Sequence, residues 1–206
     1  KNPGLKTVIV SAYGDMENIR TAMNRGAFDF LTKPINFEDL EITINKTMEE
    51  ITLLRHSQME HDQLVSIRQD LNTAREIQQA ILPKVFPPFP ERREFSLHAS
   101  MIPAREVGGD FYDYFLIDNE RLGFVIGDVS GKGVPAALFM ALSRIVVRVN
   151  ALWHRDPAKA IYDANNIITQ DSKSGMFVTL FFGTLRESDR TLTYVNAGHN
   201  PPVVFR

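Results

Sequence analysis

The feature that most constrains this chain is a stretch without glycine or proline, from Asn36 to Leu82. It predicts one helix several times longer than the roughly 11-residue mean of globular helices. Asn36 is a suitable N-cap, and Pro83 ends the helix. Helices of this length usually pair as coiled coils, so we expect residues 36–82 to form a helical linker that dimerises the chain.

The residue pattern of this helix fits a coiled-coil seam with one irregularity. The seam positions follow steps of three and four residues and are Phe37, Leu40, Ile44, Thr47, Ile51, Leu54, Gln58, His61, Leu64, Ile67, Leu71, Ala74, Gln78 and Ile81. Two consecutive steps of three around His61 predict a local overwinding. The polar seam residues Gln58 and His61 would weaken the pairing and could fix its register. The alternative is one long helix packed on its own domain.

The residues before the helix predict part of an α/β domain. A buried-type strand at 8–10 is followed by a helix with Ile19, Ala22 and Met23 on one side, and then by a second strand at 28–31. Strand, helix and strand in this order form a parallel crossover unit. Two strands cannot bury a core, so residues 1–48 are expected to be the C-terminal part of a larger domain.

The residues after the helix predict a second domain, of α+β type. Prolines make residues 83–94 a stiff connector, and alternating polar and apolar residues predict a strand at 95–101. The other predicted elements are strands at 111–117, 122–127, 177–185 and 192–197, a helix after Gly133 that runs through Leu138, Leu142, Ile145 and Val149, and a helix from Pro157 with Ala160, Ile161, Ala164 and Ile168 on one face. Antiparallel hairpins interrupted by a helix pair indicate a layered α+β sandwich over residues 95–206.

Charge, cysteine content and hydropathy exclude several functions. Lys and Arg total 23 and Asp and Glu total 25, so there is no basic excess to attract nucleic acid. The absence of cysteine excludes disulfides, thiolate zinc sites and cysteine nucleophiles. No apolar run approaches the roughly 20 residues of a membrane span. We therefore expect a cytoplasmic protein without nucleic-acid or membrane partners.

Two aspartates of the second domain are the best candidates for chemistry. Asp110 and Asp128 each lie nine residues from Asn119, in the predicted hairpin turn, so the hairpin places them nearly opposite each other. Like charges paired in this way are destabilising, and a bound cation would reverse the sign. Oxygen ligands without cysteine or clustered histidine favour Mg²⁺ or Mn²⁺. The alternatives are ordinary strand ends rich in glycine and aspartate, or a hairpin register that slips by one residue.

The glycine-rich segment 127–133 does not fit two common catalytic loops. A phosphate-binding P-loop needs four residues between its first glycine and Gly-Lys, and this segment has three before Gly131. A nucleophile elbow needs glycines two residues before and after its serine, but Asp128 and Lys132 stand there around Ser130. Both interpretations fail.

Four motifs follow one another along the second domain. They are Glu106-Val107-Gly108-Gly109-Asp110-Phe111-Tyr112-Asp113, Gly127-Asp128-Val129-Ser130-Gly131-Lys132-Gly133-Val134-Pro135-Ala136-Ala137, Met176-Phe177-Val178-Thr179 and Asn196-Ala197-Gly198-His199-Asn200-Pro201-Pro202. In this order they closely resemble the motifs of the SpoIIE-type (RsbU-like) branch of the metal-dependent type 2C serine/threonine phosphatases. The segment 74–79 with Leu82-Pro83 is similar to the regulatory linker helix that enters these domains. The resemblance covers about residues 70–206 and implies antiparallel sheets flanked by helices.

The resemblance also implies a metal site. In that family the aspartates matching Asp110 and Asp128 bind a pair of Mn²⁺ or Mg²⁺ ions, and the backbone carbonyl matching Val129 is a further ligand. The two ions activate a water for attack on a phosphate ester. The family's other metal-binding aspartates lie in later segments that are not in this sequence, so we expect an incomplete site and little or no activity from these 206 residues alone.

Four other motif residues are weaker candidates for the site. Asp113 is either a group that supports the metal ligands or a solvated strand residue. Lys132 either attracts the substrate phosphate or is simply exposed. His199 and Asn200 lie in a loop that ends in two prolines, where a turn that caps a strand is favoured over catalysis.

The first 50 residues resemble the last third of a response-regulator receiver domain. Ser11 matches the hydroxyl residue that senses the phosphoryl group, Phe30 the switch aromatic, and Lys33 the lysine before a usually cis proline. The phosphoacceptor aspartate of that family would precede Lys1, so this receiver is expected to be truncated. The alternative is a chance pair of Ser11 and Lys33 in an α/β domain.

Together the resemblances imply a receiver, phosphorylated by an upstream histidine kinase, that controls a serine/threonine phosphatase through a dimeric helical linker. The implied substrate is a phosphorylated anti-sigma-factor antagonist in partner-switching control of transcription. The alternative is a catalytically inactive phosphatase-like adaptor that binds a sigma factor, an anti-sigma factor or a protease partner.

Overall fold

The computed structural model describes residues 5–103, 106–171 and 175–205. The chain divides into two compact units, residues 1–69 and 70–206. The long helix α2 (Phe37–Ile81) contributes residues to both units and confirms the predicted long helix. The amide oxygen of Asn36 accepts a hydrogen bond from the Glu38 N–H at 2.9 Å, as expected of an N-cap.

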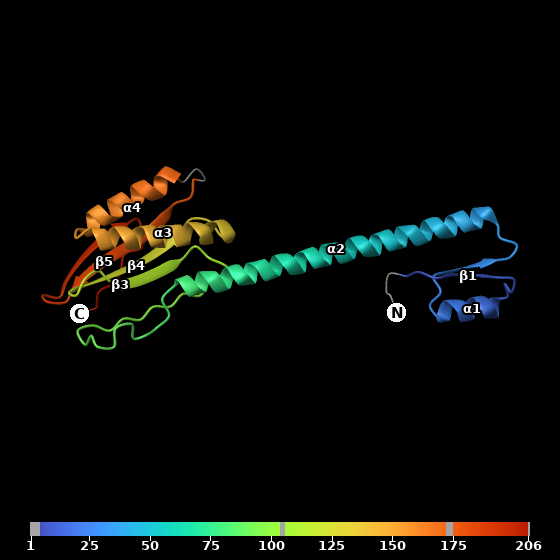
Figure 1. Ribbon diagram of the computed structural model, residues 1–206, viewed down its shortest axis with the longest axis horizontal. Helices are drawn as coiled ribbons and strands as arrows, with labels where there is room; N and C mark the ends of the chain where they lie inside the picture. The colour runs from blue at the N-terminus through green and yellow to red at the C-terminus, as the bar shows by residue number, and fades with distance from the viewer. Residues whose placement is uncertain (1–4, 104–105, 172–174, 206) are drawn as a thin grey trace. The chain divides into compact units, whose positions relative to one another are not determined.

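The first unit is built on a parallel strand–helix–strand crossover (Figure 1). Strand β1 (Val8–Ser11) pairs in parallel with β2 (Asp29–Thr32), and α1 (Met16–Asn24) connects them. The Asp15 carboxylate caps α1 by accepting from the Asn18 N–H at 2.9 Å. Both predicted strands and the predicted helix are confirmed.

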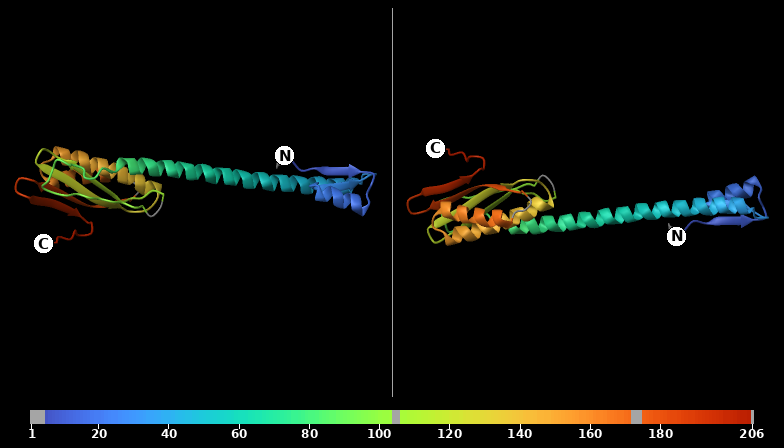
Figure 2. Two further views of the ribbon diagram at one scale, coloured as in Figure 1. Left: turned by 90° about the horizontal axis from the view of Figure 1, so that it is seen from below. Right: turned by 90° about the horizontal axis from the view of Figure 1, so that it is seen from above.

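The second unit contains a four-stranded antiparallel sheet with two helices on one face (Figures 1 and 2). The strands lie in chain order across the sheet and are β3 (Phe111–Leu116), β4 (Arg121–Val129), β5 (Val178–Arg186) and β6 (Thr191–Ala197). The helices α3 (Val134–Trp153) and α4 (Pro157–Asp171) stand between β4 and β5 in the sequence. This confirms the predicted α+β architecture and these four strands.

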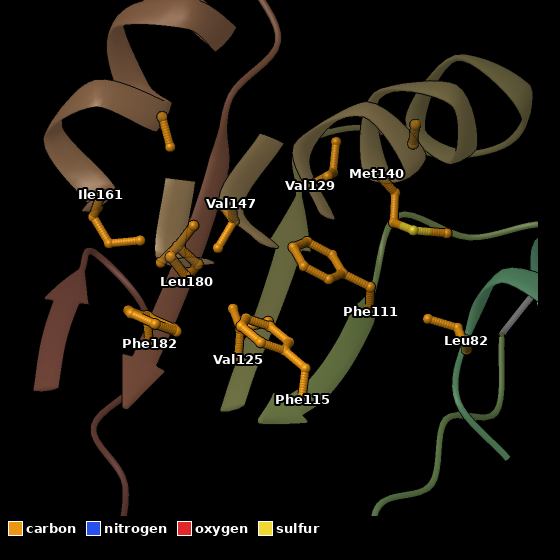
Figure 3. Close-up of a cluster of buried hydrophobic side chains, with 13 residues drawn as sticks. Leu82, Phe111, Phe115, Val125, Val129, Met140, Val147, Ile161, Leu180 and Phe182 are labelled. Carbon is orange, nitrogen blue, oxygen red and sulfur yellow. The ribbon is translucent and has the colours of Figure 1, made fainter. Parts of the chain in front are cut away.

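The core of the second unit lies between the sheet and its two helices (Figure 3). Phe111 of β3, Val129 of β4 and Met140 of α3 belong to one buried cluster. Phe111 and Val129 directly follow Asp110 and Asp128 in the sequence. Successive strand residues point to opposite faces, so burial of these two apolar side chains turns both aspartates away from the core.

Helix α3 buries a face other than the one marked by its large aliphatic residues. Leu138, Leu142, Ile145 and Val149, the positions that predicted the helix, are all exposed. The residues that are buried instead are Ala136, Met140, Ser143, Val147, Asn150 and Ala151. By length and composition α3 passes as a candidate membrane span, with a mean hydropathy of 1.5 over its most apolar window. Its buried residues nevertheless include members of the core cluster, which lies between the sheet and the two helices.

The predicted strand at 95–101 is wrong. Exposure does alternate along these residues, as the sequence pattern required, but no ladder joins them to another strand in the described part of the chain. Instead the connector covers the second face of β3, where the ring of Phe86 lies 4.8 Å from that of His98 and 5.5 Å from that of Tyr114. The alternating exposure of these residues therefore shows which side chains face the domain. It does not indicate pairing with another strand.

The predicted seam of α2 meets two different environments. Residues 52–69 are exposed throughout, and they include the apolar seam positions Leu54, Leu64 and Ile67. In the second unit, Gln78 is buried and bonded to Gly108 of the same chain. The prediction of a seam that continues through Gln78 is therefore wrong at that turn, while pairing through the exposed turns stays a prediction.

Candidate functional site

The β3–β4 hairpin brings Asp110 and Asp128 to one end of the sheet. Its register pairs Phe111 with Gly127, so the next pair outward is Asp110 and Asp128. Asp128 is paired on its other side with Thr179 of β5. The placement that the spacing from the hairpin turn predicted is confirmed, and a slipped register is excluded.

The two aspartates border two surface hollows. One, of about 400 Å³, is lined by both carboxylate residues and also by Gly109 and Lys132. The other, of about 550 Å³, is lined by both aspartates and also by His199. Lys132 is exposed at the first hollow. The pair is therefore accessible from two sides, with a cationic side chain beside one of them.

Partial desolvation and a neighbouring carboxylate act together on Asp110, which is itself exposed. Desolvation raises the pKa of Asp110 above its usual value, and hydrogen bonding to Asp128 and the charge of Asp128 raise it further. His199 acts in the opposite direction on the same pKa. The site thus resists carrying two negative charges at once, and a divalent cation would relieve this repulsion.

Asp110→Asn is expected to stabilise the metal-free protein at pH 7 by about 0.2–1 kcal/mol, the range for directly opposed side-chain pairs. Because the pKa of Asp110 is raised from 3.8 in the folded chain, the stability that its protonation provides is present below that value. It is lost as the pH rises through the folded pKa. Urea unfolding of the variant and the parent in EDTA, at pH 7 and at pH 3.5, measures the difference between their free energies of unfolding. This difference should be smaller at pH 3.5. A variant less stable than the parent at pH 7 would contradict this.

The donors at this end of the sheet fit a hard divalent cation. Two carboxylates are available, and the Val129 carbonyl lies beside Gly109, where an added Cβ would be 2.9 Å from its oxygen. Oxygen donors of this kind suit Mn²⁺ or Mg²⁺. Across the described ranges, no group of three or more His, Asp or Glu side chains comes together as a metal cluster. The protein side chains that would hold an ion here are therefore Asp110 and Asp128.

Gly109 is packed too closely against β4 for a side chain. A Cβ there would lie 2.9 Å from the Val129 oxygen and 3.0 Å from the Val129 Cβ. Gly109→Ala should lower the free energy of unfolding by about 1–3 kcal/mol through overpacking. The control is Gly108→Ala, whose Cβ would meet the Pro103 Cβ at an ordinary 3.5 Å. Urea unfolding of the two variants compares them, and equal stabilities would show that the close approach is not important.

His199 belongs to a strand-capping turn and also reaches the site. The Asn196 side chain accepts from the His199 N–H at 2.8 Å and donates to the His199 carbonyl at 3.0 Å, which fixes the turn after β6. The His199 Nδ1 lies 3.0 Å from the Thr179 Oγ1. The favoured turn is thus present, and it places the ring at the hollow shared with the two aspartates. Asn200 is exposed.

Asp113 is not a solvated residue, and it lies on the other side of the sheet from Asp110. Its side chain is fully buried and pairs with Arg144 at 3.0 Å and Arg148 at 3.2 Å, both on α3. Asp113 has the same strand parity as the core residue Phe111, and Asp110 has the opposite parity. Both expectations for Asp113 are therefore wrong, because two arginines reach this position and allow a carboxylate to face the helices.

Two residues near the site were missed by sequence reasoning. Gln78 of α2 bonds Gly108, and Thr179 of β5 contacts His199. Thr179 lies within a motif that was recognised, so its position was a usable signal. Gln78 had been assigned to the coiled-coil seam, and a polar residue at a seam position next to the domain boundary was the signal that it has another partner.

In the first unit, the three candidate receiver residues lie on or directly after the strand pair. Ser11 ends β1, Phe30 lies in β2, and Lys33 follows β2, with the Lys33 N–H donating to the Ser11 carbonyl at 2.9 Å. The peptide bond between Lys33 and Pro34 is cis, as expected. Parallel pairing therefore places Ser11 and Lys33 at one edge, and their role in sensing phosphorylation stays a prediction.

Comparison with known proteins supports the resemblance of the second unit. Residues 118–206 match the family model of stage II sporulation protein E (SpoIIE). Protein IcfG of Synechocystis sp. is 35% identical over 165 residues, which cover 67% of this chain and 26% of that protein. The phosphoserine phosphatase RsbU of Bacillus subtilis is 31% identical over 147 residues, which cover 69% of this chain and 42% of that protein. The chain thus spans less than half of either relative.

A solved structure agrees in fold. The SiaA-PP2C domain of Pseudomonas aeruginosa is 28% identical with a TM-score of 0.52, covering 65% of this chain and 54% of that chain. These similarities support a SpoIIE/RsbU-like PP2C phosphatase domain. A shorter similarity, 36% identity over 47 residues, links 23% of this chain to 11% of the transcriptional regulatory protein ZraR of Escherichia coli. Support for a receiver is accordingly weak and partial.

Proposed function

We propose that this chain is part of a metal-dependent protein serine/threonine phosphatase. The observation that carries the proposal is the pairing of Asp110 with Asp128 beside an accessible hollow, which the β3–β4 register enforces at an electrostatic cost. A relative that matches 69% of this chain is named a phosphoserine phosphatase, which supports phosphate ester hydrolysis as the reaction.

The residues have separable roles in this reaction. Asp110, Asp128 and the Val129 carbonyl would hold Mn²⁺ or Mg²⁺, which supplies an activated water and offsets charge on the phosphate oxygens when bound. Lys132, exposed at the same hollow, attracts the dianionic phosphate of the substrate. His199, positioned by Thr179, lies at the second hollow beside the two aspartates.

We further propose how the enzyme is regulated. The strand–helix–strand unit is part of a receiver that a histidine kinase phosphorylates, with Ser11, Phe30 and Lys33 as its switch residues. The exposed apolar turns of α2 at 52–69 pair two copies of the chain and transmit the signal. The substrate is a phosphorylated antagonist of an anti-sigma factor, in the cytoplasm, and its dephosphorylation frees a sigma factor by partner exchange.

One observation favours a second candidate function. In the described residues the two aspartates do not belong to a group of three or more His, Asp or Glu side chains that could hold a metal ion, so the side-chain donors fall short of a closed metal site. A protein with such a site could serve as a phosphatase-like adaptor that binds a sigma factor, an anti-sigma factor or a protease partner without hydrolysis.

The two functions are separated by a direct assay. The complete protein, incubated with a phosphoserine protein substrate, should release inorganic phosphate in the presence of Mn²⁺. The release should stop when EDTA is added. Tight binding of the phosphorylated protein without any release of phosphate, with or without Mn²⁺, would favour the adaptor and exclude the enzyme.

A further inference from the structure

The last turns of α2 contact the segment that leads into Asp110. The Gln78 side chain is only 4% exposed. Its amide nitrogen donates to the Gly108 carbonyl at 2.6 Å, and its amide oxygen accepts from the Gly108 N–H at 3.0 Å. One buried side chain thus satisfies both backbone groups of a single residue. Leaving such buried backbone groups without partners is unfavourable, so the contact is maintained wherever α2 is packed here.

The segment from Gly108 to Asp110 has little freedom on its other side. Gly109 packs directly against Val129 of β4, as the 2.9 Å approach of an added Cβ to the Val129 oxygen shows. Phe111, the next residue, is buried in the core. Asp110 follows Gly108 by two residues, which span at most about 7 Å. A displacement of Gln78 is therefore transmitted to Asp110 along the chain.

Other contacts already attach the end of α2 to the sheet. Leu82 is buried in the core cluster. The hydroxyls of Tyr112 and Tyr114 on β3 donate to the carbonyls of Pro83 and Val85, each at 2.8 Å. These contacts hold the chain after the helix against the strand that follows Asp110. Gln78 is different because it holds the residues that precede Asp110.

We propose that Gln78 is a positioning residue that couples α2 to the metal-binding carboxylate of Asp110. With the helix in the observed register, the amide keeps Gly108 in place and Asp110 opposite Asp128. Rotation or axial displacement of α2 at this turn separates the amide from Gly108, and the segment carrying Asp110 then moves out of line with its partner. The inference rests on the proposed function, because it requires a metal ion bound by these two carboxylates.

Gln78→Met tests the coupling in the complete protein. Methionine keeps the side-chain length and the helix propensity but removes the amide. The primary readout is the Mn²⁺ concentration that gives half of the full Mn²⁺-induced rise in melting temperature. We expect this concentration to increase about tenfold, the lower end of the effect for groups that orient metal ligands. Hydrogen exchange at the Gly108 amide should also become faster.

The matched control is Gln79→Met, the same substitution one position further along the helix, at a crevice lined by Lys84 and Phe86. It should leave the half-saturating Mn²⁺ concentration unchanged. Gln78→Glu keeps the acceptor for the Gly108 N–H and loses the donor, so it should fall between the parent and Gln78→Met. It also provides a second variant should methionine prevent folding.

The outcomes separate the inference from the proposed function. A lower melting temperature alone does not support the coupling, because a purely structural hydrogen bond would change stability and leave the half-saturating Mn²⁺ concentration as it was. A parent that responds to Mn²⁺ while Gln78→Met responds at the same concentration overturns the inference and leaves the phosphatase intact. A parent that shows no Mn²⁺ response, indistinguishable from Asp110→Asn, overturns both.

Discussion

Asp110→Asn is expected to reduce the Mn²⁺-dependent phosphatase activity of the complete protein by at least about 100-fold. Asparagine keeps the size and one oxygen of the side chain but loses the charge that holds a divalent cation. Groups that merely support metal ligands are already worth about 10–100-fold, so a direct ligand should reach the upper end of that range or exceed it. The measurement is kcat/KM on a phosphoserine protein across a Mn²⁺ titration.

The control for this result is Glu120→Gln, which removes one negative charge from the exposed turn of the same hairpin. Its activity should stay within about twofold of the parent, because exposed charges at this distance are screened by salt. Asp128→Asn should resemble Asp110→Asn, since both carboxylates serve the same ion. Parent-like activity of a folded Asp110→Asn would exclude the proposed site.

Asp113→Ala is expected to lower the free energy of unfolding by about 3–5 kcal/mol, the range for breaking a buried ion pair from one side. The substitution leaves Arg144, whose side chain is only 11% exposed, without its partner. Arg148 is 41% exposed and lies 4.9 Å from the Phe115 ring, so it can turn to solvent at lower cost. Chemical denaturation followed by circular dichroism measures the loss.

The double variant Asp113→Ala/Arg144→Met distinguishes an unpaired buried charge from a simple cavity. Removing both charges should recover a substantial part of the stability lost in Asp113→Ala, because the desolvated arginine is then gone. A double variant whose loss equals the sum of the two single losses would show that the pair is not coupled. Folded Asp113→Ala should also retain the Mn²⁺ half-saturation of the parent, because the pair faces α3.

Local patterns were sufficient for most of the fold. Strands β3 and β4 were predictable because apolar runs flank a turn rich in Asp and Asn, and the position of Asn119 midway between two aspartates fixed the register. Helix α4 was predictable because its buried residues, Ala160, Ile161, Ala164 and Ile168, recur at helical spacing. In each of these cases the information lies within one element or one hairpin.

The failures arose where a distant partner decides the structure. The alternation at 95–101 required a neighbouring strand that is not there, and the segment packs as a connector instead. The large aliphatic residues at 138, 142, 145 and 149 predicted the helix α3 but are exposed, and its buried residues are a mixture that includes Ala136, Ser143 and Ala151, so hydrophobicity alone does not identify the buried face. Tertiary contacts overrode a correct local pattern in both cases.

The polar side chains show the same limit. Asp113 faces the core because two arginines of α3 reach it, and one of them, Arg148, lies 35 residues away in the sequence. Gln78 is buried by a glycine 30 residues later in the chain. A sequence pattern identifies each residue as polar, but only the fold determines whether it meets water, a metal ion or a buried partner.

The central claim is that Asp110 and Asp128 are held together in order to share a divalent cation, and a crystal of the complete protein grown with Mn²⁺ tests it most directly. We predict an anomalous manganese peak within about 2–2.5 Å of a carboxylate oxygen of each aspartate, and its absence in crystals of Asp110→Asn. Manganese bound elsewhere, with the two carboxylates still in contact and without a metal ion between them, would contradict the account.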